Sequence, residues 1–165
     1  MARTLASIAA THGNAFYRGE LTQAMVAHAH ASGALHTLAD FAEHTVDWVA
    51  PLGLDYAATT VHEIPPNGQG IAALLALGIL RAFDLQSLPP DSVASQHLQI
   101  EAMKLGFADA YRFVSDPRTM ELPPSALLDP DYLASRARLI DPQRAQDFGP
   151  GDPPRGGTVY LCAAD

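Results

Sequence analysis

The sequence predicts a helix-dominated α+β fold, and three features support that prediction. Two long segments, residues 71–83 and 93–114, repeat apolar residues at intervals of three and four, as amphipathic helices do. Residues 45–64 instead alternate apolar with other residues and are rich in β-branched types, which is typical of strands. The chain has 165 residues, 48% of them hydrophobic, which is enough for one buried core.

Three short helices are expected in the N-terminal part of the chain. The first is favoured by its alanine content. The second is followed by Gly33, a residue type that commonly ends a helix. The third begins at Thr37, and Asp40 stands three residues later, which is the pattern of a capping box. These helices are expected to span residues 2–12, 19–32 and 37–43.

A β-hairpin is expected within residues 45–64. Apolar residues alternate along 46–52, and strand-forming residues resume at Tyr56. The segment Gly53-Leu54-Asp55 lies between the two stretches and is expected to form the turn. Pro51 would confine the first strand to a sheet edge or a bulge, because proline cannot donate a backbone hydrogen bond.

The second half of the chain is expected to be helical, followed by a loop. A dense apolar helix spans residues 71–83, and the longest helix follows Asp91 or Ser92 and ends before Asp116-Pro117. Its apolar stripe is expected to face the core. That stripe consists of Val93, His97, Ile100, Met103, Phe107, Tyr111 and Val114. A single turn at 125–128, a short helix at 129–140 and an exposed Pro/Gly-rich loop at 148–157 complete the expected elements.

Charge and composition exclude several kinds of partner. Ten Lys and Arg against 18 Asp and Glu give a net charge of −8, and no cluster of cations is present, so no nucleic-acid partner is expected. The longest apolar run covers residues 71–80, about half the length that a bilayer span requires, so no membrane span is expected. The single cysteine, Cys162, leaves no internal disulfide.

Three residue groups have the composition of a functional site but are explained more simply by structure. The seven histidines show no HxxxH or Cys/His spacing, so neither a metal nor any cofactor is predicted. Gly68-Gln69-Gly70 precedes a helix and could present N–H groups to an anion, but it lacks the further residues of a nucleotide-binding loop. Glu101 and Asp109 could act as paired acid–base carboxylates, although a solvated helix face is the favoured interpretation.

The tripeptide Gly156-Gly157-Thr158 opens the last expected strand, residues 158–165. A threonine hydroxyl is a poor nucleophile unless a base lies beside it, and a free α-amine on the same residue can serve as that base. Attack of the Thr158 hydroxyl on the Gly157 carbonyl would liberate the amine, and flexible glycines favour the required bend. Gly-Gly-Thr is common, so from the pattern alone an ordinary strand-opening threonine is the favoured interpretation.

Several segments together resemble the γ-glutamyltransferase family across nearly the whole chain. They occur in the family's order and at its spacing. These segments are NAFYRGE at 14–20, the Pro65-Pro66 turn into the helix at Ile71, EAMKLGFADA at 101–110, Asp116-Pro117, and GTVYLCAAD at 157–165.

The resemblance implies a fold, a nucleophile and an activity. The fold is that of N-terminal-nucleophile hydrolases, two stacked sheets between helical layers (αββα). The precursor cleaves itself between Gly157 and Thr158, and Thr158 becomes the catalytic nucleophile for γ-glutamyl hydrolysis or transfer from glutathione-like amides. Residues 1–157 would be the C-terminal part of the large subunit and residues 158–165 the first strand of the small subunit.

On this interpretation the chain is a fragment that lacks segments of both subunits, which would be its partners together with a γ-glutamyl substrate. The fragment alone is therefore expected to be inactive and unprocessed. Its exposed apolar surface would favour self-association.

Two alternatives stay open. The cleavage point reads Thr158-Val159-Tyr160 where the familiar pattern is Thr-Thr-His, which is closer to the branch that shades into cephalosporin acylases. An N-terminal-nucleophile amidase of other acyl specificity, such as a glutaryl acylase, would keep Thr158 and change the acyl group. A non-catalytic helical interaction domain would make Thr158 purely structural.

Overall fold

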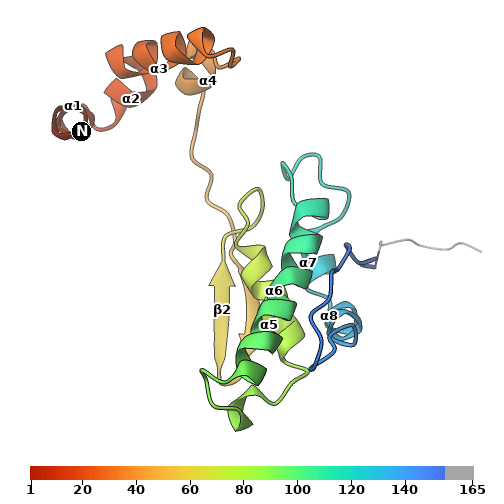
Figure 1. Cartoon of the computed structure of the whole chain (residues 1–165). Helices are drawn as coiled ribbons and strands as arrows, with labels where there is room; N and C mark the ends of the chain where they lie inside the picture. The colour runs from red at the N-terminus through yellow and green to blue at the C-terminus, as the bar shows by residue number, and fades with distance from the viewer. Residues whose placement is uncertain (155–165) are drawn as a thin grey trace, which may run out of the picture. The chain divides into compact units, whose positions relative to one another are not determined.

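The computed structural model describes residues 1–154, and the chain divides into two compact units, Met1–Trp48 and Val49–Asp165 (Figure 1). The expected strand at 158–165 lies outside the described residues, as does Thr158. The elements that are described are mostly helical, with one two-stranded antiparallel sheet. The described part therefore has the helix-dominated α+β character that the sequence predicts.

The first unit contains short helices only. The first of them ends at Ala10 with Thr11 as its C-cap, two residues earlier than expected. Gly13, with φ of 87°, is instead the N-cap of a helix starting at Asn14 that the sequence did not indicate. The expected capping box is present, since the Thr37 backbone N–H donates to Asp40 Oδ2 at 2.7 Å and Asp40 N–H donates to Thr37 Oγ1 at 3.3 Å. The helices are α1 (Ala2–Ala10), α2 (Asn14–Arg18), α3 (Glu20–Ala31) and α4 (Leu38–Ala42).

The second unit begins with a β-hairpin whose register differs from the expected one. Its strands are β1 (Leu52–Tyr56) and β2 (Thr59–Glu63), so the turn expected at residues 53–55 is wrong. Gly53 lies inside β1 opposite His62, and a Cβ added at Gly53 would lie 3.2 Å from the His62 ring. Glycine is therefore in this strand to make room for a cross-strand imidazole, not to form a turn.

Five helical elements follow the hairpin, and α5 is the most buried of them. Helix α5 contacts β1, α6 and α8, so it forms the centre of the unit (Figure 1). The dense apolar pattern of residues 71–83 predicted this helix, although its regular part ends at Leu80. The elements are α5 (Ile71–Leu80), the 3₁₀ turn η1 (Leu85–Ser87), α6 (Val93–Phe113), α7 (Pro124–Leu127) and α8 (Pro130–Ala137).

The buried face of α6 is not the expected one. Val93 is 88% exposed and Tyr111 73% exposed, and Ile100 and Met103 are exposed as well. Most of the stripe therefore lies on the outside of the described unit, although Val114 packs partly against the core. The face against α5 carries small residues and leucines instead. These are Leu98, Ala102, Leu105, Gly106 and Ala110. Small side chains let the two helix backbones approach closely, which a pattern of large apolar residues does not reveal.

Gly106 lies where the backbones of α5 and α6 pack closely. A Cβ added at Gly106 would lie 2.8 Å from the carbonyl oxygen of Ala72, a backbone atom that cannot move aside without shifting α5. We expect Gly106→Ala to lower the free energy of unfolding by about 1–3 kcal/mol, as overpacked core positions do. Urea denaturation followed by circular dichroism measures this change.

Gly78→Ala in α5 is the matched control. Its added Cβ would also be close, 2.6 Å from Leu133 Cδ1, but that atom is the end of a flexible side chain. Both variants gain the same helix propensity, about 1 kcal/mol for Gly to Ala. Gly106→Ala should therefore cost clearly more than Gly78→Ala, and equal or reversed costs would contradict the close backbone packing.

Candidate functional site

The structure describes the segment that leads toward the predicted cleavage point, but not the point itself. Gly157 and Thr158 lie beyond the last described residue, Pro154, so their roles stay predictions. The loop expected to be exposed at 148–157 is described up to residue 154, and there it lies partly against the helices. Pro153 is fully buried, and Gly151 is partly buried. The expectation of an exposed loop therefore holds for Gly149, Pro150, Asp152 and Pro154, and it is wrong for Pro153, which is buried.

Two buried carboxylates on α6 hold that segment. Asp109 is 0% exposed and Glu101 is 1% exposed, so the expectation of a solvated face for this pair is wrong. Eight residues of α-helix separate them, about 12 Å along the axis at 1.5 Å per residue. Buried carboxylates of this kind are tolerated only when hydrogen bonds or charges compensate them, and both are compensated here.

Asp109 accepts three hydrogen bonds from two separate parts of the second unit, helix α8 and the segment at Gly151. Its Oδ2 accepts from the Tyr132 hydroxyl at 2.8 Å and from Arg136 Nε at 3.1 Å, both on α8. Its Oδ1 accepts from the backbone N–H of Gly151 at 2.8 Å. Arg136 Nη2 in turn donates to the carbonyl of Gly149 at 2.8 Å. We call Asp109, Tyr132 and Arg136 the Asp109 anchor.

Glu101 makes a second attachment to the same segment of main chain, at Gln146, five residues before Gly151. Its Oε1 pairs with Lys104 Nζ at 2.7 Å, and its Oε2 accepts from the backbone N–H of Gln146 at 3.1 Å. Lys104 also donates to the carbonyl of Gln146, and its ammonium lies 5.3 Å from the centre of the Phe148 ring. The two acids of α6 thus hold the main chain at residues 146 and 151.

These contacts indicate a positioning role for the acids. Asp109 is fully buried and accepts three hydrogen bonds, one of them from a cation, so a substrate has no open side of it to approach. Glu101 is closed in the same way by Lys104 and Gln146. The idea that the pair performs acid–base catalysis is therefore not supported, and its function is to hold a segment of main chain.

The buried Tyr132 hydroxyl gives a prediction for alkaline pH. Burial, together with the hydrogen bond to Asp109, raises the pKa of Tyr132 well above its ordinary value of 10.0. Above pH 10 the unfolded chain has lost this proton while the folded chain keeps it, so stability falls as pH rises. Tyr132→Phe should remove the part of the decline in unfolding free energy that comes from this hydroxyl. At pH 8 the variant should be less stable than the wild type by about 0.5–1.5 kcal/mol, because it lacks the hydrogen bond to Asp109.

Urea denaturation at pH 8 and at pH 11 measures both effects. Tyr111→Phe is the control, because Tyr111 is largely exposed and its replacement should keep the wild-type decline. A Tyr132→Phe chain that declines as steeply as the wild type would contradict the assignment.

The start of α5, singled out for anion binding, is occupied by a side chain of the protein itself. A Cβ added at Gly70 would lie 2.3 Å from Glu63 Oε2, so the Glu63 carboxylate lies against the first residues of the helix. A carboxylate at a helix N-terminus is favourable because the free N–H groups there carry partial positive charge. Glycine at position 70 leaves room for it.

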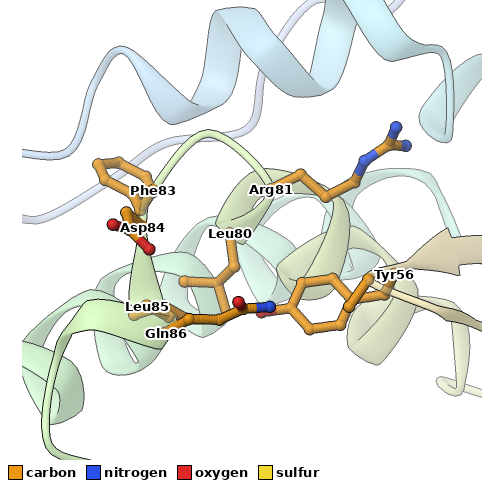
Figure 2. A pocket seen from close by; sticks show the side chains of 8 residues that line it. Tyr56, Leu80, Arg81, Phe83, Asp84, Leu85 and Gln86 are labelled. Carbon is orange, nitrogen blue, oxygen red and sulfur yellow. The ribbon is translucent and has the colours of Figure 1, made fainter.

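A separate cavity of about 340 Å³ lies where β1 meets the C-terminal end of α5 (Figure 2). Its polar side chains include Arg81, Asp84 and Gln86, and Asp84 Oδ1 accepts from the Ser87 backbone N–H at 3.3 Å. Figure 2 shows the Arg81 guanidinium and the Asp84 carboxylate lying apart. Together they form neither a nucleophile–base pair nor a shared anion site.

The described residues hold no group of three or more His, Cys, Asp or Glu side chains placed to bind a metal ion. Across residues 1–154, no helix is both long and apolar enough to cross a membrane.

Comparison with known proteins identifies the family. The family described as gamma-glutamyltranspeptidase matches residues 1–165. The Glutathione hydrolase-like YwrD proenzyme of Bacillus subtilis is 36% identical over 140 residues, covering 85% of this chain and 27% of the relative. The chain belongs to the gamma-glutamyltranspeptidase family, which confirms the resemblance stated above.

Two solved structures show the same fold. The cephalosporin acylase from Bacillus halodurans matches with a TM-score of 0.79 and 41% identity, over 92% of this chain and 28% of that one. The gamma-glutamyltranspeptidase from Pseudomonas nitroreducens complexed with L-DON matches with a TM-score of 0.72 and 31% identity, over 88% and 44%. The described chain therefore forms a helix-rich α+β part of an N-terminal-nucleophile hydrolase fold, and it spans about a quarter of the curated relatives' length.

Sequence reasoning singled out Asp109 but not its burial, and it missed Tyr132 and Arg136, although one signal for the burial of Asp109 was present. Ala102, Gly106 and Ala110 recur every four residues on α6, which marks the face of close helix contact. Asp109 lies beside that face, so the small-residue pattern would have placed it inside. Tyr132 and Arg136 carry no comparable signal in the sequence.

Proposed function

We propose that the full-length protein is an autoprocessing γ-glutamyl hydrolase or transferase whose nucleophile is Thr158. The observation that supports this most is the family match, which extends over residues 1–165 and so includes Gly157-Thr158. Relatives of this chain carry the names glutathione hydrolase proenzyme and acylase proenzyme. Cleavage before Thr158 requires an uncleaved precursor, which is what the word proenzyme denotes in those names.

Processing begins with attack of the Thr158 hydroxyl oxygen on the Gly157 carbonyl carbon. The peptide bond between the two residues breaks as an ester forms, and the Thr158 nitrogen gains a proton. Water then hydrolyses the ester, leaving a Gly157 carboxylate and a free Thr158 with both its hydroxyl and its α-amine. An α-amine has an ordinary pKa of about 7.7–8.0, so part of it is neutral near physiological pH and able to act as a base.

Turnover uses the same two groups. The Thr158 amine accepts the hydroxyl proton as the oxygen attacks the γ-glutamyl carbonyl, and it returns that proton to the leaving amine. The resulting acyl-enzyme passes its γ-glutamyl group to water in hydrolysis or to an amino acid in transfer. Two easier steps replace one difficult attack on an amide.

Intact mass and N-terminal sequence of the purified full-length protein test this proposal. We expect two chains, one of them beginning at Thr158, and release of the aniline from a γ-glutamyl anilide. The 165-residue chain alone is expected to keep a single mass and to show no turnover. A full-length protein that hydrolyses the anilide as one uncleaved chain would exclude the proposed nucleophile.

A second acyl specificity is favoured by one observation, the 41% identity to the cephalosporin acylase from Bacillus halodurans. Acylase ACY 1 proenzyme from a Pseudomonas strain is a further relative, 31% identical over 151 residues. A glutaryl group lacks the α-ammonium of a γ-glutamyl group, so matched γ-glutamyl and glutaryl anilides distinguish the two specificities. Both substrates use Thr158, and only their relative kcat/KM values differ.

A further inference from the structure

From the geometry of the Asp109 anchor we infer that it is a positioning device for precursor cleavage, and that Gly151 is the residue through which it acts. This inference rests on the proposed cleavage between Gly157 and Thr158. Asp109 and Arg136 together bind the main chain on both sides of Pro150, through the Gly151 N–H and the Gly149 carbonyl. They therefore fix the main chain shortly before the predicted cleavage point.

Gly151 fits this anchor because it has no Cβ. An added Cβ would lie 2.3 Å from the Tyr132 hydroxyl oxygen and 2.9 Å from Arg136 Cδ, both parts of side chains that already hold Asp109. An alanine here must either push those side chains off Asp109 or leave the anchor itself. Position 151 therefore requires glycine as long as the main chain is bound to Asp109 and Arg136.

Gly149 lies two residues earlier and has the opposite surroundings. An added Cβ there would meet nothing within 4 Å. Its carbonyl accepts from Arg136, and alanine would keep that carbonyl. Neither Gly149 nor Gly151 has a positive φ, so alanine imposes no backbone strain at either position. Gly149→Ala and Gly151→Ala therefore form a matched pair. Only Gly151→Ala disturbs the contact between the main chain and the Asp109 anchor.

The anchor fixes the main chain close to the predicted nucleophile. Thr158 is seven positions after Gly151, a reach of at most about 25 Å at 3.3–3.6 Å per residue. If residues 146–153 leave the helices, buried Pro153 included, the last buried residue that the structure describes before Thr158 is Ile140, eighteen positions earlier. Because closure probability falls roughly as the −3/2 power of length, this loss alone predicts about fourfold slower closure, or about twofold if the attachment at Gln146 persists.

The test measures the cleavage rate of the full-length precursor made by cell-free synthesis with labelled methionine, followed over time on a denaturing gel. We expect Gly151→Ala to be cleaved two- to fourfold more slowly than the wild type, and Gly149→Ala at the wild-type rate. Once cleaved, both variants should show the wild-type kcat/KM, because the anchor acts on the uncleaved bond.

Equal cleavage rates for Gly151→Ala and Gly149→Ala would overturn the inference. An equal loss of cleavage rate and of mature kcat/KM in Gly151→Ala would also overturn it, by showing a purely structural role. Arg136→Lys provides a second variant, since lysine keeps the positive charge beside Asp109 but lacks the fork that reaches both Asp109 and the Gly149 carbonyl. It should slow cleavage as well.

These outcomes are separate from failure of the proposed function. A wild-type precursor that is never cleaved before Thr158 would remove the proposed function and this inference together. A wild-type precursor that is cleaved there, with Gly151→Ala cleaved equally fast, would remove only the inference.

Discussion

Thr158→Ala in the full-length precursor is expected to leave a single uncleaved chain and to reduce γ-glutamyl anilide hydrolysis on the order of 10³-fold or more. In the proposed mechanism, alanine removes the oxygen that attacks the Gly157 carbonyl and later the substrate carbonyl, so both reactions lose their nucleophile. Removing the nucleophile of a hydrolase commonly costs this much or more in kcat. Intact mass and initial rates of aniline release measure the two losses.

Thr158→Ser is the matched control. Serine keeps the hydroxyl on the same atom position and, after cleavage, keeps the α-amine beside it. This variant should be cleaved and should turn over substrate, at rates lower than the wild type but well above those of Thr158→Ala. Cleavage and hydrolysis that both survive in Thr158→Ala would instead favour a structural role for this threonine.

Asp109→Ala is expected to destabilise the 165-residue chain by about 3–5 kcal/mol, the range for breaking one side of a buried ion pair. It leaves the guanidinium of Arg136 buried without its carboxylate. It also removes the acceptor for the Tyr132 hydroxyl and the Gly151 N–H. Urea denaturation measures the change, compared with the wild type at the same pH.

Asp116→Ala is the control for Asp109→Ala. Asp116 also pairs with an arginine, Arg118, at 2.6 Å, but both side chains are substantially exposed. Ion pairs in that setting contribute little because water and salt screen them. The urea midpoint of Asp116→Ala should stay close to that of the wild type. An Asp109→Ala chain of equal stability would contradict the burial of this pair.

Local signals predicted much of the fold. The Thr37–Asp40 capping box depends on residues three apart, and it is present as expected. The core helix α5 follows from an apolar composition so dense that eight of its ten residues are buried. Both features are determined within one or two turns of chain, so the sequence around them contains the necessary information.

The face of α6 and the register of the hairpin depend on distant residues and were mispredicted. Val93 and Tyr111 fit a helical stripe well, but α5 selects the face with Gly106, where the backbones can approach. Gly53 fits a turn by itself, but the His62 ring across the sheet accounts for it. In both cases the local pattern is compatible with two structures, and a residue elsewhere in the chain decides between them.

The candidate site also has one part that local sequence predicts and one part that it does not. Thr158 could be nominated from Gly-Gly-Thr and from the resemblance, because short motifs carry that information. The Asp109 anchor joins residues 23, 27 and 42 positions apart in the chain, and no local spacing relates them. Only tertiary structure brings Asp109, Tyr132, Arg136 and Gly151 together.

The hydrogen bond between Gly151 and Asp109 also affects the chain end that cleavage would produce. Six residues, 152–157, would stay covalently tethered to the anchored glycine, with a new carboxylate at their end. At 3.3–3.6 Å per residue, that carboxylate could lie no farther than about 20 Å from Gly151. The anchored glycine would thus limit how far the severed end can move from α6 and α8.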